Sequence, residues 1–346
     1  MNRLATGLLL VLLVLSSCPL RAQEAFVRRS VVEEFTGTWC GNCPRGIVGM
    51  QRLAEDFGDR FIGIAIHTGV GEPMLIPTYP DVKTDLMPGS GAPCCAIDRV
   101  KFKFDPYAGS GRRGYNHYGI DQDFAAALAV PTEAKVELTA QWDDEYQWDV
   151  RFNVVTTFNI DSPTAPYRLV MVLTEDGLTG TDDSWRQTNY YSLDYEAGTG
   201  ANFADDDMKA WREAPYHVEN VVYNHVAVNT MGIRSGIAGS ISAPIVAWQP
   251  QTFSSTLTTL ASHAQRIIQD KNRLSAVVML INTETGQVVN AAKAPVAPYG
   301  QSGIRDLEPR TADDALPAGK AYDLQGRQQP SSHKGIYIRN GKKQLR

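Results

Sequence analysis

The feature that most constrains the fold is a pair of cysteines, Cys40 and Cys43, within the segment EFTGTWCGNCPRG. Residues 31–35 (VVEEF) precede the pair and have the composition of a short strand. Residues 44–58 follow it with apolar side chains at helical spacing and open with a proline, which suits a first helical turn. Residues 61–67 (FIGIAIH) form the next buried strand. Strand, helix and strand with short connections predict a parallel pair joined by a crossover helix.

The two thiols have the sequence setting of a redox pair. A thiolate attacks a disulfide, so Cys40 needs a depressed pKa, and the amino end of a helix stabilises its negative charge. Arg45 adds a positive charge in the same turn, and Cys43, one turn further, is placed to resolve a mixed disulfide. Glu33 and Glu34 alternate faces of the strand, so one of them points inward and would carry protons for Cys43. The alternative is that both are ordinary strand-end acids.

Cysteine usage favours a local site over a disulfide scaffold. After the amino-terminal segment the cysteines occur as two close pairs, Cys40 with Cys43 and Cys94 with Cys95, whereas a stapled scaffold would spread them along the chain. A structural disulfide between the first two remains an alternative to redox chemistry. Zinc is a minor alternative, since adjacent ligands depart from the usual spacing of zinc cysteines. We predict no metal and no cofactor.

Residues 32–44 resemble the active-site segment of thioredoxin-fold oxidoreductases, in which a strand, an aromatic residue, WCxxC and a helix follow one another. The resemblance implies that Trp39 belongs to the site and that Glu34 takes the place of a buried aspartate. It also implies that Pro93 is the cis-proline that shapes the substrate groove, with a cis Ala92–Pro93 bond.

Cys94 takes the place after the proline, where that family usually carries threonine or another small residue. We therefore expect Cys94 beside Cys40, as a third redox thiol, and Cys95 in packing on the opposite face of the strand. The alternative is that both are small, semi-buried side chains.

Beyond residue 134 the pattern changes to strands with alternating apolar positions, which is typical of an antiparallel β sandwich. The predicted fold class is an α/β thioredoxin-like domain followed by an all-β domain. The predicted organisation is a signal peptide (1–23), a thioredoxin-like domain (24–130), a β-sandwich domain (131–296), a linker (297–318) and a carboxy-terminal sorting-like segment (319–346).

The first residues have the pattern of a signal peptide. Arg3 precedes an apolar core at residues 8–15, which is too short to span a bilayer. We favour cleavage near residues 21–23, and the alternative is a lipobox that ends at Cys18, which would then carry lipid. The formal net charge is −5 and basic residues are not clustered, so no nucleic-acid surface is predicted.

Residues 30–296 resemble the Omp-twenty-eight family of Bacteroidota envelope proteins. The resemblance is carried by VVEEFTGTWCGNCPRGIVGM, APCCAIDRV, YRLVMVLTEDGL, YNHVAVNTMG and AVVMLINTETGQVVNAAK. It implies a thioredoxin-like domain followed by a β domain, located at the outer membrane or cell surface, with the periplasm as the alternative. The tail, with YDLQGR, KGIYI and NGKK, resembles a type IX secretion sorting signal; the alternative is a small hairpin without a sorting role.

Two hypotheses of function follow, and the sequence leaves open whether the chain is an enzyme. In the first, an exported thiol–disulfide oxidoreductase uses Cys40 to attack and Cys43 to resolve, while Pro93 shapes the groove and Glu34 moves protons. Its partner is a cysteine-containing protein or a small disulfide, together with a redox partner protein. In the second, a non-enzymatic surface protein binds a partner through its β domain, and the cysteine pair is structural.

Overall fold

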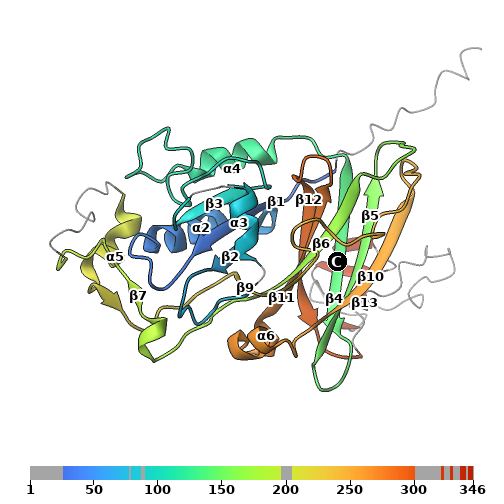
Figure 1. Cartoon of the computed structure of the whole chain (residues 1–346). Helices are drawn as coiled ribbons and strands as arrows, with labels where there is room; N and C mark the ends of the chain where they lie inside the picture. Colours follow the sequence, from blue (N-terminus) through green and yellow to red (C-terminus); the bar gives the residue numbers. More distant parts are fainter. Residues whose placement is uncertain are drawn as a thin grey trace, which may run out of the picture. The chain divides into compact units, whose positions relative to one another are not determined.

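Figure 1 shows the computed structural model of the chain, which describes residues 26–77, 79–86, 90–195 and 205–300, together with short strands between residues 321 and 345. The chain divides into two compact units, Met1–Gln301 and Ser302–Arg346. The predicted signal peptide and most of the predicted linker lie outside the described residues. None of the helices in the described residues is long and apolar enough to cross a bilayer.

The first unit is built on one large mixed sheet of ten strands, in the order β10-β5-β4-β12-β11-β6-β9-β2-β1-β3. In chain order the strands are β1 (Ser30–Thr36), β2 (Phe61–His67), β3 (Cys94–Ile97), β4 (Ala134–Trp142), β5 (Asp149–Phe158), β6 (Tyr167–Glu175), β9 (Val226–Met231), β10 (Pro250–Thr258), β11 (Leu274–Asn282) and β12 (Val288–Ala297). Two further short strands, β7 (Gln187–Thr188) and β8 (His217–Val218), pair with each other.

Helices lie on both faces of the β1–β3 end of the sheet. They are α2 (Pro44–Phe57), α3 (Pro80–Leu86) and α4 (Ile120–Leu128), and the unit also contains α5 (Lys209–Glu213) and α6 (Ser262–Ile267). Helices α2 and α4 pack together on one face, where Phe57 contacts Phe124 edge to face. Val82, in α3, packs on the opposite face with Phe35 of β1. The predicted strand–helix–strand unit is confirmed, since β1 and β2 are parallel and α2 connects them.

Helix α2 starts and ends where its sequence predicts. Pro44 occupies its first turn, and Gly58 follows its last residue with φ +53°, a conformation that glycine adopts without steric cost. Its buried face carries Met50 and Leu53, which pack with Val32 of β1 in the cluster shared with α4. This packing fixes the amino end of α2, and hence the cysteine pair, at the end of β1.

The second part of the unit contains the predicted antiparallel strands, but they continue the same sheet. Ala65 of β2 pairs with Val226 of β9, and one hydrophobic cluster extends from Phe35 to strands β4 to β12. The edge strand β10 also comes close to β9, to which it is not adjacent in the sheet. There the Asn229 side-chain amide of β9 donates to the Thr258 carbonyl of β10 at 2.7 Å. Strands from both parts of the first unit therefore belong to one mixed sheet, and a domain boundary near residue 130 stays a prediction.

The second unit contains four short strands, in the order β14-β13-β15-β16, and the pairs within it are antiparallel. They are β13 (Ala321–Tyr322), β14 (Gln328–Gln329), β15 (Ile336–Arg339) and β16 (Lys342–Leu345). Short strands were the expectation for this segment, and its sorting role stays a prediction.

Candidate functional site

Cys40 and Cys43 form a disulfide at the amino end of α2, with their Cα atoms 5.3 Å apart. Cys43 is the residue immediately before the helix, and its carbonyl accepts the Gly46 N–H at 2.8 Å. The Cys43 N–H in turn donates to the Cys40 carbonyl at 3.0 Å, which closes the loop. The predicted placement of the pair between a strand and a helix start is therefore confirmed.

A buried acid–histidine pair that the sequence did not reveal anchors the residue two positions before Cys40. The N–H and hydroxyl of Thr38 donate to the Glu72 carboxylate at 2.8 and 3.1 Å. The other oxygen of Glu72 lies 2.9 Å from Nδ1 of His67, and both side chains are buried. No spacing rule links these positions, because His67 ends β2 and Glu72 lies in the following loop.

Trp39 is half exposed beside the disulfide, at 50% accessibility. Its indole N–H donates to the Thr68 carbonyl at 2.5 Å, which fixes the ring. The ring lies over Gly37 and Gly69, where an added Cβ would overlap it. Trp39 therefore offers a fixed aromatic surface next to the cysteines, in keeping with its predicted place in the site.

A segment far along the sequence, residues 187–191, lies over the disulfide loop; we call it the strap. Its backbone is hydrogen-bonded to the loop, since the Thr188 N–H donates to the Thr38 carbonyl and the Tyr190 N–H to the Gly41 carbonyl, both at 2.8 Å. The strap therefore occupies two backbone carbonyls of the disulfide loop.

Side chains of the strap complete the cover. The Gln187 amide donates to the Cys40 carbonyl at 2.9 Å, and the Tyr191 hydroxyl donates to the Asn42 carbonyl at 3.2 Å. As a result Cys40 is only 3% exposed and Cys43 is fully buried. In this conformation the disulfide is closed to a folded protein substrate.

The strap continues into a group of stacked aromatic rings. Tyr190 lies so close to Gly41 that an added Cβ there would overlap its ring. Tyr190 stacks on Tyr195 with centroids 5.2 Å apart, and Tyr195 contacts Tyr216 at 4.8 Å. These contacts hold the strap from its outer side.

The two neighbouring glutamates of β1 have opposite environments. Glu33 faces α3 and is fully paired: Arg99 donates to both of its carboxylate oxygens, at 2.9 and 2.8 Å, and the Tyr79 hydroxyl donates at 2.7 Å. Glu34 faces α2 and is 2% exposed, and its Oε1 has no hydrogen-bond partner among the described residues. The two acids lie on opposite faces of the strand, as strand alternation predicted, but both are buried, so the expectation that only one of them points inward was wrong.

The Glu34 carboxyl lies against the first turn of α2. A Cβ added at Gly46 would overlap its Oε1, so a glycine at this position lets the carboxyl lie against the helix. Burial, and secondarily the negative charge of Asp105, raises the pKa of Glu34 from 4.5 to about 8. The side chain is therefore mostly protonated at pH 7.

The charge predicted beside Cys40 is already paired. Arg45 forms an ion pair with the buried Asp105 carboxylate at 2.5 Å. The expected stabilisation of a Cys40 thiolate by Arg45 is therefore offset by Asp105. The amino terminus of α2 remains the main group that would stabilise the thiolate.

The Ala92–Pro93 peptide bond is cis, as the resemblance implied, and Pro93 directly precedes β3. The register of β3 on β1 pairs Cys95 with Glu34 and Cys94 with Phe35. Paired residues share a face of the sheet, so Cys95 rather than Cys94 lies on the α2 face beside Glu34.

Both thiols are free and fully buried. Burial raises the pKa of the Cys94 thiol, and it raises that of Cys95 well above its ordinary value. Neither is an activated thiolate at neutral pH, and a redox role for Cys94 stays a prediction. Among the described residues, no group of three or more acidic, histidine and cysteine side chains is placed to bind a metal ion.

Comparisons with known proteins bear on the fold alone. No model of a protein family and no curated protein matches the sequence. Among solved structures, the chain is similar to HBP35 of Porphyromonas gingivalis, with 14% identity and a TM-score of 0.52 over 93% of this chain and 98% of that chain.

Two other solved structures match less well. One is a protein from Agrobacterium tumefaciens, with 13% identity and a TM-score of 0.40 over 81% of this chain and 98% of that one. The other is a domain of the outer membrane lipoprotein Omp28 from Porphyromonas gingivalis, with 13% identity and a TM-score of 0.23 over 49% of this chain and 93% of that domain. At these scores we draw nothing from either. The chain thus has the overall fold of HBP35, at an identity too low to transfer an activity.

Proposed function

We propose that the chain is an exported, thioredoxin-like thiol–disulfide oxidoreductase in which Cys40 and Cys43 are the redox pair. The observation that carries the proposal is Glu34, a buried carboxyl whose Oε1 has no hydrogen-bond partner among the described residues and lies against the helix turn that Cys43 begins. A structural disulfide has no use for such a group, whereas a dithiol needs a nearby proton donor and acceptor whose pKa lies near the working pH.

In the proposed reaction, Glu34 gives a proton to Cys43 in one direction and takes it back in the other. When a thiolate attacks Cys40, the disulfide breaks, a mixed disulfide forms at Cys40, and the Cys43 sulfur leaves with the electron pair and takes the proton of Glu34. In the opposite direction the ionised Glu34 carboxylate takes the proton of the Cys43 thiol. The resulting thiolate attacks Cys40, restores the disulfide and releases the substrate as a thiolate.

The strap decides which substrates have access. A small thiol or disulfide needs only a narrow opening to Cys40, whereas an extended cysteine-containing protein must displace residues 187–191 from the loop. Trp39 and the cis Pro93 segment are the proposed contact surfaces for such a protein, and a separate redox protein would supply or remove electrons. These assignments follow from the resemblance to thioredoxin-fold oxidoreductases and from the exposure of Trp39.

The low exposure of Cys40 favours a second candidate function. At 3% accessibility, under a hydrogen-bonded strap, the disulfide has the surroundings of a structural bond. In that case the chain is a non-enzymatic envelope protein that binds a partner through its β strands. This candidate leaves the unpaired Glu34 unexplained, and we rank it second for that reason.

We also propose that the protein belongs to the Omp28-related envelope proteins and acts at the outer membrane or cell surface, with the periplasm as the alternative. The signal-peptide pattern of residues 1–23 and the sorting-like pattern of residues 319–346 support this location.

Insulin reduction by dithiothreitol tests the proposed activity. The mature chain is expected to accelerate precipitation of the insulin B chain, and Cys40→Ser is expected to be no faster than buffer because the attacking sulfur is gone. A Gln187→Ala variant, in which the strap is loosened, is measured in parallel. If wild type and Gln187→Ala both match buffer, the oxidoreductase proposal fails and the structural disulfide remains.

A further inference from the structure

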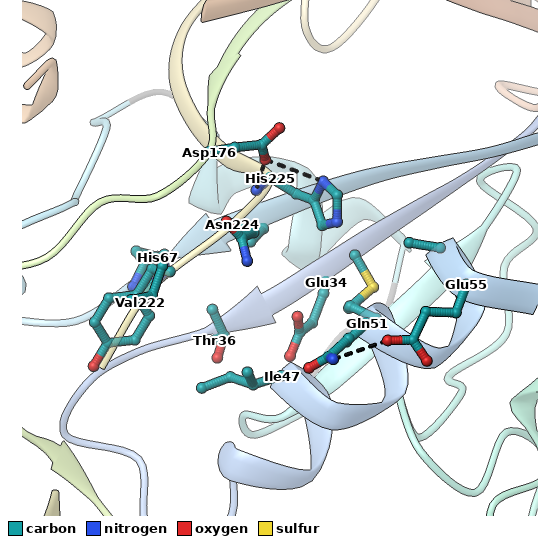
Figure 2. A pocket seen from close by; sticks show the side chains of 14 residues that line it. Glu34, Thr36, Ile47, Gln51, Glu55, His67, Asp176, Val222, Asn224 and His225 are labelled. Carbon is teal, nitrogen blue, oxygen red and sulfur yellow. Dashed lines mark hydrogen bonds and ion pairs between the residues drawn. The ribbon is translucent and has the colours of Figure 1, made fainter. Parts of the chain in front are cut away.

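A pocket of about 430 Å³ lies between α2 and the loop before β9, over β1 and β2. Its volume is in the range of small-molecule sites, about 300–1,000 Å³. Figure 2 shows the Glu34 side chain in the middle of this pocket, between α2 and the loop that carries Asn224. The pocket thus reaches the buried carboxyl from the flank of α2.

The walls of the pocket combine apolar surface with negative charge. Ile47, Met50 and Tyr223 supply apolar and aromatic wall, and Glu55 and Asp176 supply further carboxylates. None of the described residues that line the pocket is a lysine or arginine. The lining therefore disfavours an anion and suits a ligand with an apolar body and a positive head.

The other acids of the pocket already have partners. Asp176 accepts the main-chain N–H of His225 at 2.6 Å and lies 3.6 Å from the Lys293 ammonium. Glu55 accepts a hydrogen bond from the Gln51 amide at 2.9 Å. Glu55 is also exposed, so water can reach it. Glu34 is therefore the buried lining carboxyl with an unpartnered oxygen, Oε1, within the part of the chain that the structure describes.

His225 does not supply a compensating positive charge to the pocket. Burial, and secondarily the charge of Lys293, lowers the pKa of His225 to about 4, so its ring is neutral above pH 5. His67 is held by Glu72 at 2.9 Å on the side of the disulfide loop. With no lysine or arginine among the described lining residues, Glu34 Oε1 is left without a positively charged partner there.

We propose that this pocket binds a small organic cation, a primary amine or an amidine with a compact apolar body, whose positive head pairs with the Glu34 carboxylate. The apolar walls cover the body of the ligand, and the buried position of Glu34 excludes water from the ion pair. A hydrogen-bonded charge pair of this kind is stronger than the same contact at the surface.

Binding of such a cation must be linked to ionisation of Glu34. Because the pKa of the side chain without ligand is about 8, the cation displaces a proton at lower pH, and linkage makes the affinity rise about tenfold for each pH unit well below that pKa. The rise weakens near pH 8, where the carboxyl is half ionised, and the affinity becomes constant above about pH 9.

The ligand would also act on the disulfide, and this consequence rests on the proposed function. A cation that holds Glu34 ionised removes the proton that the leaving Cys43 sulfur needs, so ligand binding is expected to slow reduction of the disulfide. The binding itself requires no redox activity, so the two proposals fail independently.

Calorimetric titration of the mature, oxidised chain with benzamidine at pH 6, 7, 8 and 9 tests the site. With a pKa of about 8, we expect the dissociation constant to fall about ninefold from pH 6 to 7, about fivefold from pH 7 to 8 and less than about twofold from pH 8 to 9. Benzamide, a neutral molecule of nearly the same shape, is expected to bind at least tenfold more weakly than benzamidine at pH 8.

Two variants locate the effect. Glu34→Gln is expected to lose the pH dependence and to bind benzamidine no better than benzamide. Glu145→Gln makes the same change at an exposed residue in the β4–β5 turn and is expected to behave as wild type. A dissociation constant that does not change with pH, equal binding of benzamide, or unchanged binding by Glu34→Gln would each overturn the proposal.

Discussion

Replacing Gln187 by alanine is expected to raise the rate at which thiols reduce the Cys40–Cys43 disulfide by about tenfold or more. The Gln187 amide donates to the carbonyls of Cys40, Thr188 and Gly37, at 2.9, 3.0 and 3.4 Å. The bonds to Cys40 and Gly37 join the strap to the loop, whereas the bond to Thr188 lies within the strap. A hydrogen bond of this kind contributes about 1 kcal/mol, so losing the two that join strap and loop shifts the equilibrium between the closed and the open strap by about one order of magnitude or somewhat more.

The rate follows the opening equilibrium because the attacking thiolate must reach Cys40, which is 3% exposed when the strap is closed. We propose to mix the oxidised protein with reduced glutathione, quench with an alkylating agent and count modified cysteines by mass spectrometry. The strap of the variant should open without global unfolding, which a urea titration of the same sample checks.

Gln251→Ala is the matched control. The side-chain amide of Gln251 also bridges backbone groups, since it accepts the Ser242 N–H at 2.7 Å and donates to the Ser242 carbonyl at 3.0 Å, but it lies in β10. Its loss should leave the reduction rate unchanged. Equal rates for Gln187→Ala and Gln251→Ala would show that the strap does not limit access to the disulfide.

Replacing Glu34 by glutamine is expected to stabilise the protein at neutral pH, and the gain should grow as the pH rises. The pKa of Glu34 is about 8 in the folded chain, whereas its ordinary value, which we take for the unfolded chain, is 4.5. Between these pH values the folded chain binds more protons than the unfolded chain, so the stability of the wild type falls as the pH rises. At about 1.4 kcal/mol for each pH unit, the substitution is expected to raise the free energy of unfolding by about 3 kcal/mol at pH 7.

The same substitution at the neighbouring residue should have the opposite effect. Glu33→Gln removes the negative partner of Arg99, whose side chain is 3% exposed, and leaves a buried positive charge unpaired. Breaking a buried ion pair in this way costs about 3–5 kcal/mol. Two identical changes at adjacent residues are thus predicted to differ in sign.

Urea unfolding of wild type, Glu34→Gln and Glu33→Gln at pH 5, 6, 7 and 8 measures both effects with the disulfide intact. The stability difference between Glu34→Gln and wild type should widen steadily from pH 5 to pH 8. A difference that stays constant over this range would mean that Glu34 titrates normally and does not hold a proton in the folded protein.

The local part of the site was predictable from the sequence because it depends on neighbouring residues. Strand alternation placed Glu33 and Glu34 on opposite faces of β1, and the proline after Cys43 marked the start of α2. That both faces are buried depends on helices packed on either side of the sheet, which the strand's own sequence does not specify. The cis bond before Pro93 followed from the resemblance to thioredoxin-fold proteins rather than from any local rule.

Contacts between distant segments were not predictable in this way. A strap more than a hundred residues from Cys40 leaves no spacing signal, and neither does the pairing of Arg45 with Asp105. Which of Cys94 and Cys95 lies beside Glu34 depends on strand register, where a shift of one residue exchanges the faces.

The strands of the sheet were predictable from the sequence, whereas their pairing was not. Alternating apolar residues indicated the strands of the second part, because each strand needs only its own pattern. Their continuation from β9 onto β2 depends on the pairing of Ala65 with Val226, which neither segment specifies alone.

The reduction potential of the Cys40–Cys43 pair is the most direct test of the proposed redox function. The mature chain is equilibrated in thiol–disulfide buffers of graded potential, and the fraction of reduced protein is read by alkylation. A redox pair should exchange reversibly, with a potential between about −270 and −120 mV, the range of thioredoxin-type proteins. A potential below about −300 mV, with no exchange even in the Gln187→Ala variant, would mean that the disulfide is structural.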